Sequence, residues 1–252
     1  MIKVINQRQE EGDLFHYAHF LCDCLFPEIV NDLYLYPKVV RKKTLQQTIG
    51  NFKNIYEEVM KNKNEEVEPS QFHRLKCNLV TYRNKEEYSK LDYYKFRNYI
   101  FTIYGIVPEK HKWPEVLLIK RKGRISLIDD ETLGKENRNV TTGKERREIK
   151  DIDLLDHWMN QKYGICYTSL FLEDCDFKTQ VQYFYHAKLI VCAHGAAMSN
   201  LLFCRENECT IIEVVCNTKW KFFDTITNIL GIKHIKCNDN TLSSIQNMLC
   251  AI

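Results

Sequence analysis

The chain has 252 residues, of which 44% are hydrophobic, enough to bury a substantial core in one large domain or two small ones. Lysine and arginine number 36 and aspartate and glutamate 33, so the formal net charge is only +3. This charge is too small for a general nucleic-acid-binding protein, although a local basic cluster could still bind a diphosphate.

No apolar segment approaches the length of about 18 residues that a membrane helix requires, and the first residues turn polar before a signal-peptide core could form. We therefore expect a soluble, cytoplasmic protein without a transmembrane segment. The eleven cysteines are an odd number, and several lie in apolar, strand-like segments, which indicates reduced thiols in the core. Their spacing provides no matched pairs of zinc ligands, so we expect no structural zinc.

The first hundred residues are mostly helical by their periodicity. Apolar residues recur every three or four positions from Phe15 to Val30, which predicts an amphipathic helix that Pro27 ends or kinks. Further elements are expected after it, namely helices at 44–63 and 90–104, the latter with Gly105 as its stop, and a short strand at 75–82.

Beyond a candidate lobe boundary at 106–114, strands and helices alternate, which predicts a parallel sheet covered by helices. The expected strands are 115–120, 166–172, 188–193 and 210–215. The expected helices are 153–163, 178–187, one that begins near Ala196, 222–230 and 242–252. This half of the chain is Rossmann-like by pattern.

The most informative unit is the turn after the buried strand at 188–193. Its sequence, His194-Gly195-Ala196-Ala197-Met198-Ser199-Asn200, would open a helix whose free amide groups point at whatever lies above the carboxyl edge of the sheet. Small residues keep side chains out of the way, while the polar residues can donate hydrogen bonds to phosphate or sugar. The alternative is that the small residues merely allow the helix to pack closely on the strand.

The segment 193–203, Ala-His-Gly-Ala-Ala-Met-Ser-Asn-Leu-Leu-Phe, resembles the signature of glycosyltransferase family 61, as does the preceding helix at 180–187. A second block of the family is a helix with His and Asp four residues apart and a polar residue three positions before the His. His19, Asp23 and His16 match that spacing, with His16 in place of the more usual Asn.

A third, weaker match to the family is the basic strand end Lys120-Arg121, followed later by a segment with Arg147 in which Asp151 replaces the more typical Asn. Together the three blocks of resemblance span most of the chain, from about Glu11 to Glu213.

The resemblance implies an α/β fold of the GT-B type, with two facing Rossmann-like lobes and a cleft between them, and transfer with inversion at the anomeric carbon. We accordingly expect an acceptor-side lobe at 1–108, a nucleotide-sugar donor lobe at 109–240, and a C-terminal helix at 241–252 that could pack back on the first lobe. The expected donor is a UDP-sugar, with xylose favoured over N-acetylglucosamine. The expected acceptor is a hydroxyl of a glycan or glycoprotein, and the compact chain resembles the transferases of large DNA viruses.

An inverting transferase must deprotonate an acceptor hydroxyl and stabilise a departing diphosphate. His19 is the expected base, because Asp23 lies over the same helix face and could hold the tautomer of its imidazole, as the carboxylate of a catalytic triad does. His16 is expected to contact the acceptor. An ordinary surface pair of His19 and Asp23 is the alternative.

Basic residues could bind the leaving diphosphate without a metal, because an arginine fork fits phosphate oxygens. Of two basic clusters, at 121–124 and 146–147, we favour Arg121 and Arg147, and solvated surface charge is the alternative. Glu213, near the carboxyl end of a strand, could bind ribose hydroxyls or be a strand-edge charge. The full expected donor site is His194, Gly195, Ala196, Ser199, Asn200, Arg121, Arg147 and Glu213.

Two Asp-x-Asp triplets, at 151–153 and 174–176, resemble the metal sites of transferases with another fold, but each directly precedes a predicted helix. Aspartate in that position caps free amide groups and suits the positive end of the helix dipole. We therefore predict catalysis without a bound metal or cofactor.

Two other functions remain as rivals to the transferase. A non-catalytic glycan- or nucleotide-binding protein could share the fold and lack the base. A nucleotide-sugar epimerase would need NAD and a Gly-x-Gly-x-x-Gly turn near the start, which the sequence lacks.

Overall fold

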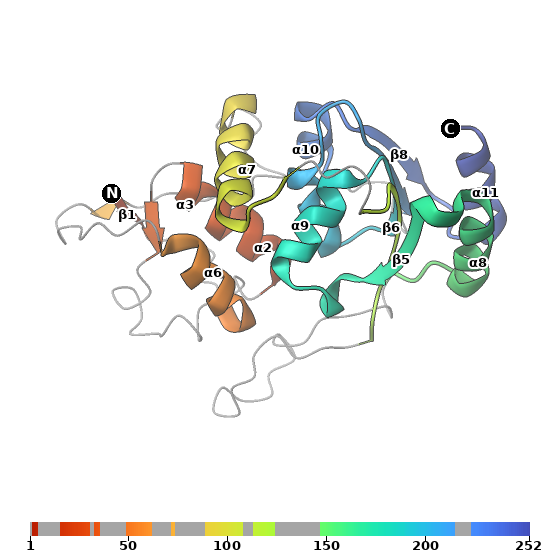
Figure 1. The fold of residues 1–252 in the computed structure, drawn as a ribbon, viewed down its shortest axis with the longest axis horizontal. Coiled ribbons are helices and arrows are strands. Elements are labelled where there is room, and N and C mark those ends of the chain that lie inside the picture. Colours follow the sequence, from red (N-terminus) through yellow and green to blue (C-terminus); the bar gives the residue numbers. More distant parts are fainter. Residues whose placement is uncertain are drawn as a thin grey trace. The chain divides into compact units, whose positions relative to one another are not determined.

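The computed structural model describes residues 2–4, 16–30, 33–35, 49–61, 72–73, 89–107, 113–123, 147–214 and 223–252 (Figure 1). The chain divides into two compact units, of which the first comprises Met1–Gly105 and Ile125–Thr141 and the second Ile106–Arg124 and Thr142–Ile252. The chain therefore leaves the first unit, returns to it once, and ends in the second. The predicted strand at 75–82 lies outside the described residues.

The first unit combines helices with a small parallel sheet. Its strands β1 (Ile2–Val4), β2 (Leu33–Leu35) and β3 (Phe72–His73) are arranged in the order β2-β1-β3. Its helical segments are α2 (Tyr17–His19), the π-helical turn η1 (Phe20–Leu25), α3 (Phe26–Val30), the 3-10 turn η2 (Gly50–Phe52), α6 (Lys53–Met60) and α7 (Lys90–Tyr104).

Helices α2, η1 and α3 form one continuous segment, which confirms the predicted first helix. Pro27 does not end it, since the helix continues to Val30. Proline cannot donate a backbone hydrogen bond, and the wider π-helical turn lies directly before it. Every residue from Phe20 to Val30 is buried, so this segment is a core helix rather than a surface helix with one apolar face.

Aromatic rings hold this buried helix in the first unit. Phe20 stacks on Phe52 with ring centroids 4.8 Å apart, and Phe26 packs at 4.9 Å against both Tyr93 and Phe96 of α7. Aromatic pairs at such distances contribute about 0.5–1.5 kcal/mol beyond the burial of their area. The ring contacts therefore fix η1 against η2, and α3 against α7.

Helix α7 has the predicted limits, because its ends carry strong local signals. Ser89 and Asp92 form a reciprocal capping box at the start, and Gly105 adopts a left-handed backbone with φ 59° at the end. The helix predicted at 44–63 is also confirmed where it is described, as η2 and α6.

The second unit is a mixed α/β domain built on a five-stranded parallel sheet. Its strands are β4 (Val116–Lys120), β5 (Tyr167–Phe171), β6 (Leu189–Ala193), β7 (Thr210–Val214) and β8 (Lys233–Cys237), in the order β5-β4-β6-β7-β8. After β4 the chain adds β5 on one side, and from β6 onwards it adds strands on the other side. The direction therefore switches between β4 and β6, which are neighbours. The four predicted strands are confirmed, whereas β8 was not predicted.

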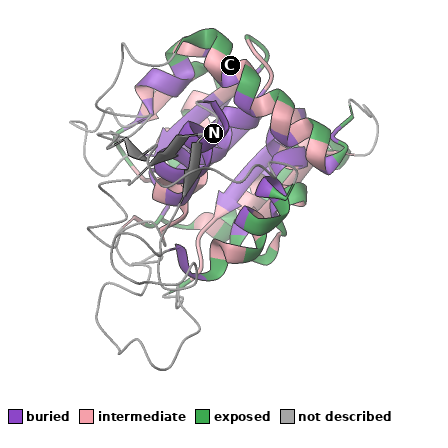
Figure 2. Cartoon of the chain, turned by 90° about the vertical axis from the view of Figure 1, so that its left-hand side faces the viewer, coloured by how far each residue is buried: buried purple, intermediate pink, exposed green. Residues whose placement is uncertain are grey.

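Helices cover both faces of this sheet (Figure 1). Helices α8 (Ile152–Tyr163) and α11 (Leu242–Cys250) lie on one face, and α9 (Phe177–His186) and α10 (Asp224–Ile229) lie on the other. The described part of the unit also contains the 3-10 segments η6 (Gly164–Cys166), η7 (Leu172–Asp174) and η8 (Ala196–Phe203). The central strands β4, β6 and β7 are almost entirely buried, and the edge strands β5 and β8 are partly exposed (Figure 2).

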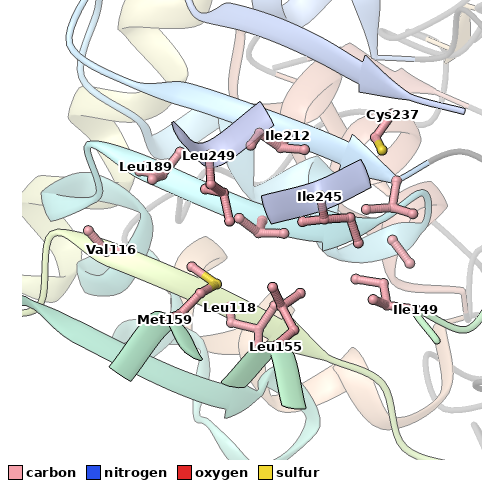
Figure 3. Packing of buried hydrophobic residues seen from close by; sticks show 13 residues of the cluster. Val116, Leu118, Ile149, Leu155, Met159, Leu189, Ile212, Cys237, Ile245 and Leu249 are labelled. Carbon is pink, nitrogen blue, oxygen red and sulfur yellow. The ribbon is translucent and has the colours of Figure 1, made fainter. Parts of the chain in front are cut away.

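The core under α8 and α11 is continuous (Figure 3). Leu155 and Met159 of α8 and Ile245 and Leu249 of α11 pack with the strand residues on that face, such as Leu118. Burial of each such side chain contributes about 1.5–3 kcal/mol. The C-terminal helix thus helps to form the core of the second unit, although the sequence also allowed a contact with the first lobe.

Among the described residues, no helix has both the length and the apolar character that crossing a bilayer demands.

Candidate functional site

The strand order predicts a ligand site at the carboxyl ends of β4 and β6. Open parallel sheets bind their ligands at the point where the strand order reverses, outside the carboxyl ends of the strands. Strand β4 leads into Arg121 there, and β6 leads into His194 and Gly195. The fold therefore brings together three of the predicted donor-site residues.

The backbone carbonyl of His194 accepts hydrogen bonds from two arginines. Nη1 of Arg121 lies 3.2 Å from this oxygen and Nη1 of Arg147 lies 3.1 Å from it. Because both bonds end on one atom, the two charged groups lie within roughly 6 Å of each other, where like charges repel. An anion beside them is therefore favoured, and guanidinium forks suit phosphate oxygens in particular.

Gly195 permits this close approach of Arg121 to the backbone. Its own backbone is extended, with φ 165°, so its conformation does not require glycine. A Cβ at this position, however, would lie 3.0 Å from Nη1 and 3.2 Å from Cζ of Arg121. A larger residue at this position would therefore require the guanidinium of Arg121 to shift by a few tenths of an ångström.

The side chain of His194 is hydrogen-bonded to the buried carboxylate of Glu213. Its Nδ1 is hydrogen-bonded to one oxygen of the Glu213 carboxylate, and the other oxygen lies 2.7 Å from Nε2 of His234. Burial alone would raise the pKa of Glu213, but the hydrogen bonds and charges of the two histidines outweigh it and lower that pKa to about 2. Glu213 is therefore a buried anion between two imidazoles, and its predicted contact with ribose stays a prediction.

The remaining predicted donor residues lie in η8. This segment begins at Ala196 as predicted, in 3-10 rather than α geometry, and Ala196 is partly exposed. Ser199 and Asn200 are fully buried, and Nδ2 of Asn200 donates to Gln180 of α9 at 3.1 Å. The position of Asn200 favours the packing role that the sequence left open, and the donor contacts of these residues stay predictions.

A small cavity of about 190 Å³ opens beside the two arginines. Its walls include the ends of three strands and the start of α8, and among its lining residues are Arg121, Arg147, Ile149, Ile152, Phe171 and Ala193. Pockets for whole drug-sized ligands reach about 300 Å³ or more, so this one matches part of a ligand, such as a single ring base.

Lys120, next to Arg121 in the chain, has a structural partner. Its ammonium group pairs with Asp156 of α8, and the same carboxylate accepts hydrogen bonds from Tyr167 at 2.6 Å and Ser169 at 2.8 Å. Burial alone would raise the pKa of Asp156, but these hydrogen bonds hold it below its usual value. Lys120 is therefore bound to α8, and Arg121 is the residue of this pair that contacts the turn after β6. Arg124 and Arg146 lie outside the described residues.

The two Asp-x-Asp triplets differ from each other. Asp176 caps α9 as predicted, since its Oδ1 accepts from the backbone of Thr179 at 2.7 Å. The predicted cap at Asp151 is wrong, because its backbone is left-handed with φ 53° and its side chain makes no cap hydrogen bond. Capping side chains extend from a residue with β-region backbone. Asp153 lies in the first turn of α8, 3.5 Å from Lys120.

The predicted base and its carboxylate are in contact in the first unit. Nδ1 of His19 lies 2.8 Å from Oδ2 of Asp23, which is fully buried, whereas 22% of the His19 side chain is exposed. A carboxylate can only accept, so Nδ1 carries the hydrogen and Nε2 keeps a lone pair that can take a proton. The ring of His16 lies edge-on to that of His19, with centroids 6.2 Å apart.

The sequence matches the family model of Glycosyltransferase 61 over residues 17–212. The chain belongs to glycosyltransferase family 61. The match includes the His19–Asp23 pair, Arg121, Arg147 and the turn after β6, and the family supports glycosyl transfer as the activity. A comparison with curated proteins finds no match.

In this family 61 glycosyltransferase, sequence reasoning missed His234 and Asp156. His234 belongs to β8, whose mixed residues, Lys233-His234-Ile235-Lys236-Cys237, gave no clear strand pattern. Asp156 falls on an exposed-looking position of the predicted helix at 153–163. Polar and apolar residues do alternate from His234 to Cys237, as they do in a strand with one buried face, but the alternation covers only four residues.

Proposed function

We propose that this glycosyltransferase moves a sugar from a UDP-sugar to a hydroxyl of a glycan or glycoprotein, with inversion at the anomeric carbon. The observation that carries the proposal is the convergence of Arg121 and Arg147 on the carbonyl of His194, at the switch point of the sheet. The choice of donor sugar, xylose before N-acetylglucosamine, rests on the resemblance to the family.

The diphosphate of the donor binds beside the two guanidinium groups. Its nucleobase occupies the cavity next to them, where Phe171, Ile149 and Ile152 offer apolar walls. The volume of about 190 Å³ is large enough for a single base, and the choice of uridine rests on the resemblance to the family.

The transfer step follows from the chemistry of the two sites. Nε2 of His19 takes the proton of the acceptor hydroxyl as the acceptor oxygen attacks the anomeric carbon. The bond between that carbon and the diphosphate oxygen breaks, and UDP leaves with the electron pair and one more negative charge. Asp23 stabilises the imidazolium, and the arginines stabilise the charge on UDP.

We propose that no metal ion takes part. Two guanidinium groups can supply the positive charge that a divalent ion supplies in other transferases. Three of the four aspartates in the Asp-x-Asp triplets have other contacts, since Asp176 caps α9, Asp174 pairs with Lys122, and Asp153 lies beside Lys120. Activity is therefore expected to persist in EDTA.

The GT-B arrangement is part of the same proposal. The first unit serves as the acceptor-side lobe and the second as the donor lobe. The presence of a parallel sheet in each unit supports this assignment.

A thermal-shift screen tests the donor assignment. UDP and UDP-sugars are expected to raise the melting temperature by more than ADP, GDP or UMP, and the double variant Arg121→Ala/Arg147→Ala is expected to lose the shift. Hydrolysis of UDP-xylose and UDP-N-acetylglucosamine, with and without EDTA, then identifies the sugar. The absence of a shift with every uridine compound would contradict the proposal.

A non-catalytic nucleotide-binding protein would give a different result. It would show the shift with UDP but neither hydrolyse nor transfer any sugar. The hydrogen bond between His19 and a buried carboxylate favours the enzyme, because it prepares Nε2 as a base.

A further inference from the structure

The cavity beside the two arginines has a buried apolar wall and an exposed acidic rim. Ile119, Ile149 and Ala193 line it and are almost fully buried, so they form its inner side. Asp153 and Glu148 also line it, and both are exposed. A ligand whose apolar part enters this cavity therefore passes carboxylates where it emerges into solvent.

Asp153 lies at this rim in the first turn of α8, with 93% of its side chain exposed. Its Oδ1 lies 3.5 Å from Nζ of Lys120, and the ammonium group of Lys120 is itself held by Asp156. A fixed positive charge thus lies beside a carboxylate that is largely covered by water. Such a carboxylate can accept hydrogen bonds from a ligand without first being removed from a buried contact.

The order of groups in a nucleoside diphosphate relates this carboxylate to the ribose. The ribose connects the base to the diphosphate, so it lies between a base in the cavity and phosphates at Arg121 and Arg147. Its 2′ and 3′ hydroxyls are neighbouring donors, and the two oxygens of one carboxylate can accept from both. Acidic side chains bind ribose hydroxyls in dinucleotide-binding folds, whereas a carboxylate repels phosphate.

We propose that Asp153 binds the ribose hydroxyls of the donor nucleotide. The inference rests on the proposed function, because it takes a nucleoside diphosphate to be the ligand of the cavity. Asp153 is more accessible than Glu213, which is buried and hydrogen-bonded to two histidines.

Deletion of one ribose hydroxyl tests the contact from the side of the ligand. 2′-deoxy-UDP lacks the 2′ hydroxyl of UDP and is expected to bind the wild type about tenfold more weakly, because a hydrogen bond to a charged group is lost. In Asp153→Ala the two ligands are expected to bind with affinities within about twofold of each other, since the partner of the hydroxyl is gone. The readout is the dissociation constant of each ligand, measured by calorimetry in the presence of EDTA.

The loss of a negative charge by itself has the opposite effect on affinity. UDP is an anion, so removal of a nearby carboxylate strengthens its binding through space. Asp153→Ala is nevertheless expected to bind UDP about tenfold more weakly than the wild type, because the lost hydrogen bonds outweigh this gain. Glu173→Ala, at an exposed carboxylate of η7, is the matched control and should keep the wild-type preference for UDP over 2′-deoxy-UDP.

An unchanged preference for UDP in Asp153→Ala would overturn the proposal, since Asp153 would then be an ordinary solvated charge. Loss of the preference in Glu148→Gln, with the preference retained in Asp153→Ala, would assign the ribose to the other carboxylate of the rim. Melting temperatures are measured in parallel, and Asp153→Asn replaces the alanine variant if that variant does not fold. If the wild type binds neither ligand, the proposed function itself fails, whereas equal binding of both by the wild type overturns the ribose contact alone.

Discussion

The space for a side chain at Gly195 is already occupied by the guanidinium of Arg121. In Gly195→Ala the new methyl group would lie 3.0 Å from Nη1, so Arg121 has to move by a few tenths of an ångström. We expect UDP affinity to fall about tenfold, because charge-assisted hydrogen bonds to phosphate depend on geometry. The melting temperature should change little, since the extended backbone suits alanine.

Calorimetry with UDP checks this expectation, and Gly123→Ala is the control. A Cβ at Gly123 would meet no atom within 4 Å, so that variant should bind normally. Wild-type affinity in Gly195→Ala would show that the position of Arg121 does not matter for the donor.

The buried carboxylate of Asp23 supports a second residue-level prediction. In Asp23→Asn the amide cannot stabilise a protonated His19 as a carboxylate does, and kcat for transfer is expected to fall by about 10²- to 10⁴-fold. The dissociation constant for UDP is measured alongside and should not change. An unchanged kcat would remove His19 from the role of base.

Residue contacts differ in how far sequence could predict them. His19 and Asp23 are neighbours on one helix, and spacing of four residues is enough to predict their contact. Glu213 meets His194 and His234 across three strands, and the contact depends on the strand order and on β8, which was not predicted. The position of the Glu213 carboxylate near a strand end suggested ribose, but its two histidine partners could not be predicted without the strand order.

At the level of elements, Asp156 joins α8 to two strands. In Asp156→Asn the buried end of Lys120 loses its main partner, and Tyr167 and Ser169 lose a charged acceptor. We expect the free energy of unfolding to fall by about 1–3 kcal/mol, measured by urea denaturation. Asp153→Asn is the control, because that side chain is 93% exposed, and it should change stability by less than about 0.5 kcal/mol. Equal losses in the two variants would contradict the assigned role of Asp156.

Elements with local end signals were the ones predicted best. Helix α7 carries a capping box and a left-handed glycine, and its limits were predicted correctly. The π-helical turn before Pro27 and the 3-10 geometry of η8 were not predicted. Over so few residues, apolar residues recur at nearly the same spacing in a π-helix or 3-10 helix as in an α-helix.

The whole molecule should lose stability in acid partly through Glu213. Its pKa is about 2 in the folded protein and near its ordinary value of 4.5 in the unfolded chain. A group with a lowered folded pKa contributes its full stability above the unfolded value and loses it as the pH falls toward the folded value. Stability is therefore expected to decline between about pH 4.5 and pH 2. Urea unfolding at several pH values should give a flatter profile for Glu213→Gln, and parallel profiles would contradict this account.

The path of the chain between the two units has a practical consequence. Because Ile125–Thr141 belongs to the first unit and lies between two parts of the second, one proteolytic cut cannot release either unit intact. Cleavage after Gly105 would yield an N-terminal fragment that lacks part of its own unit and a C-terminal fragment that carries this part as an insertion. To express the second unit alone, a deletion of 125–141 with a short bridge from Arg124 to Thr142 is required in addition to the truncation.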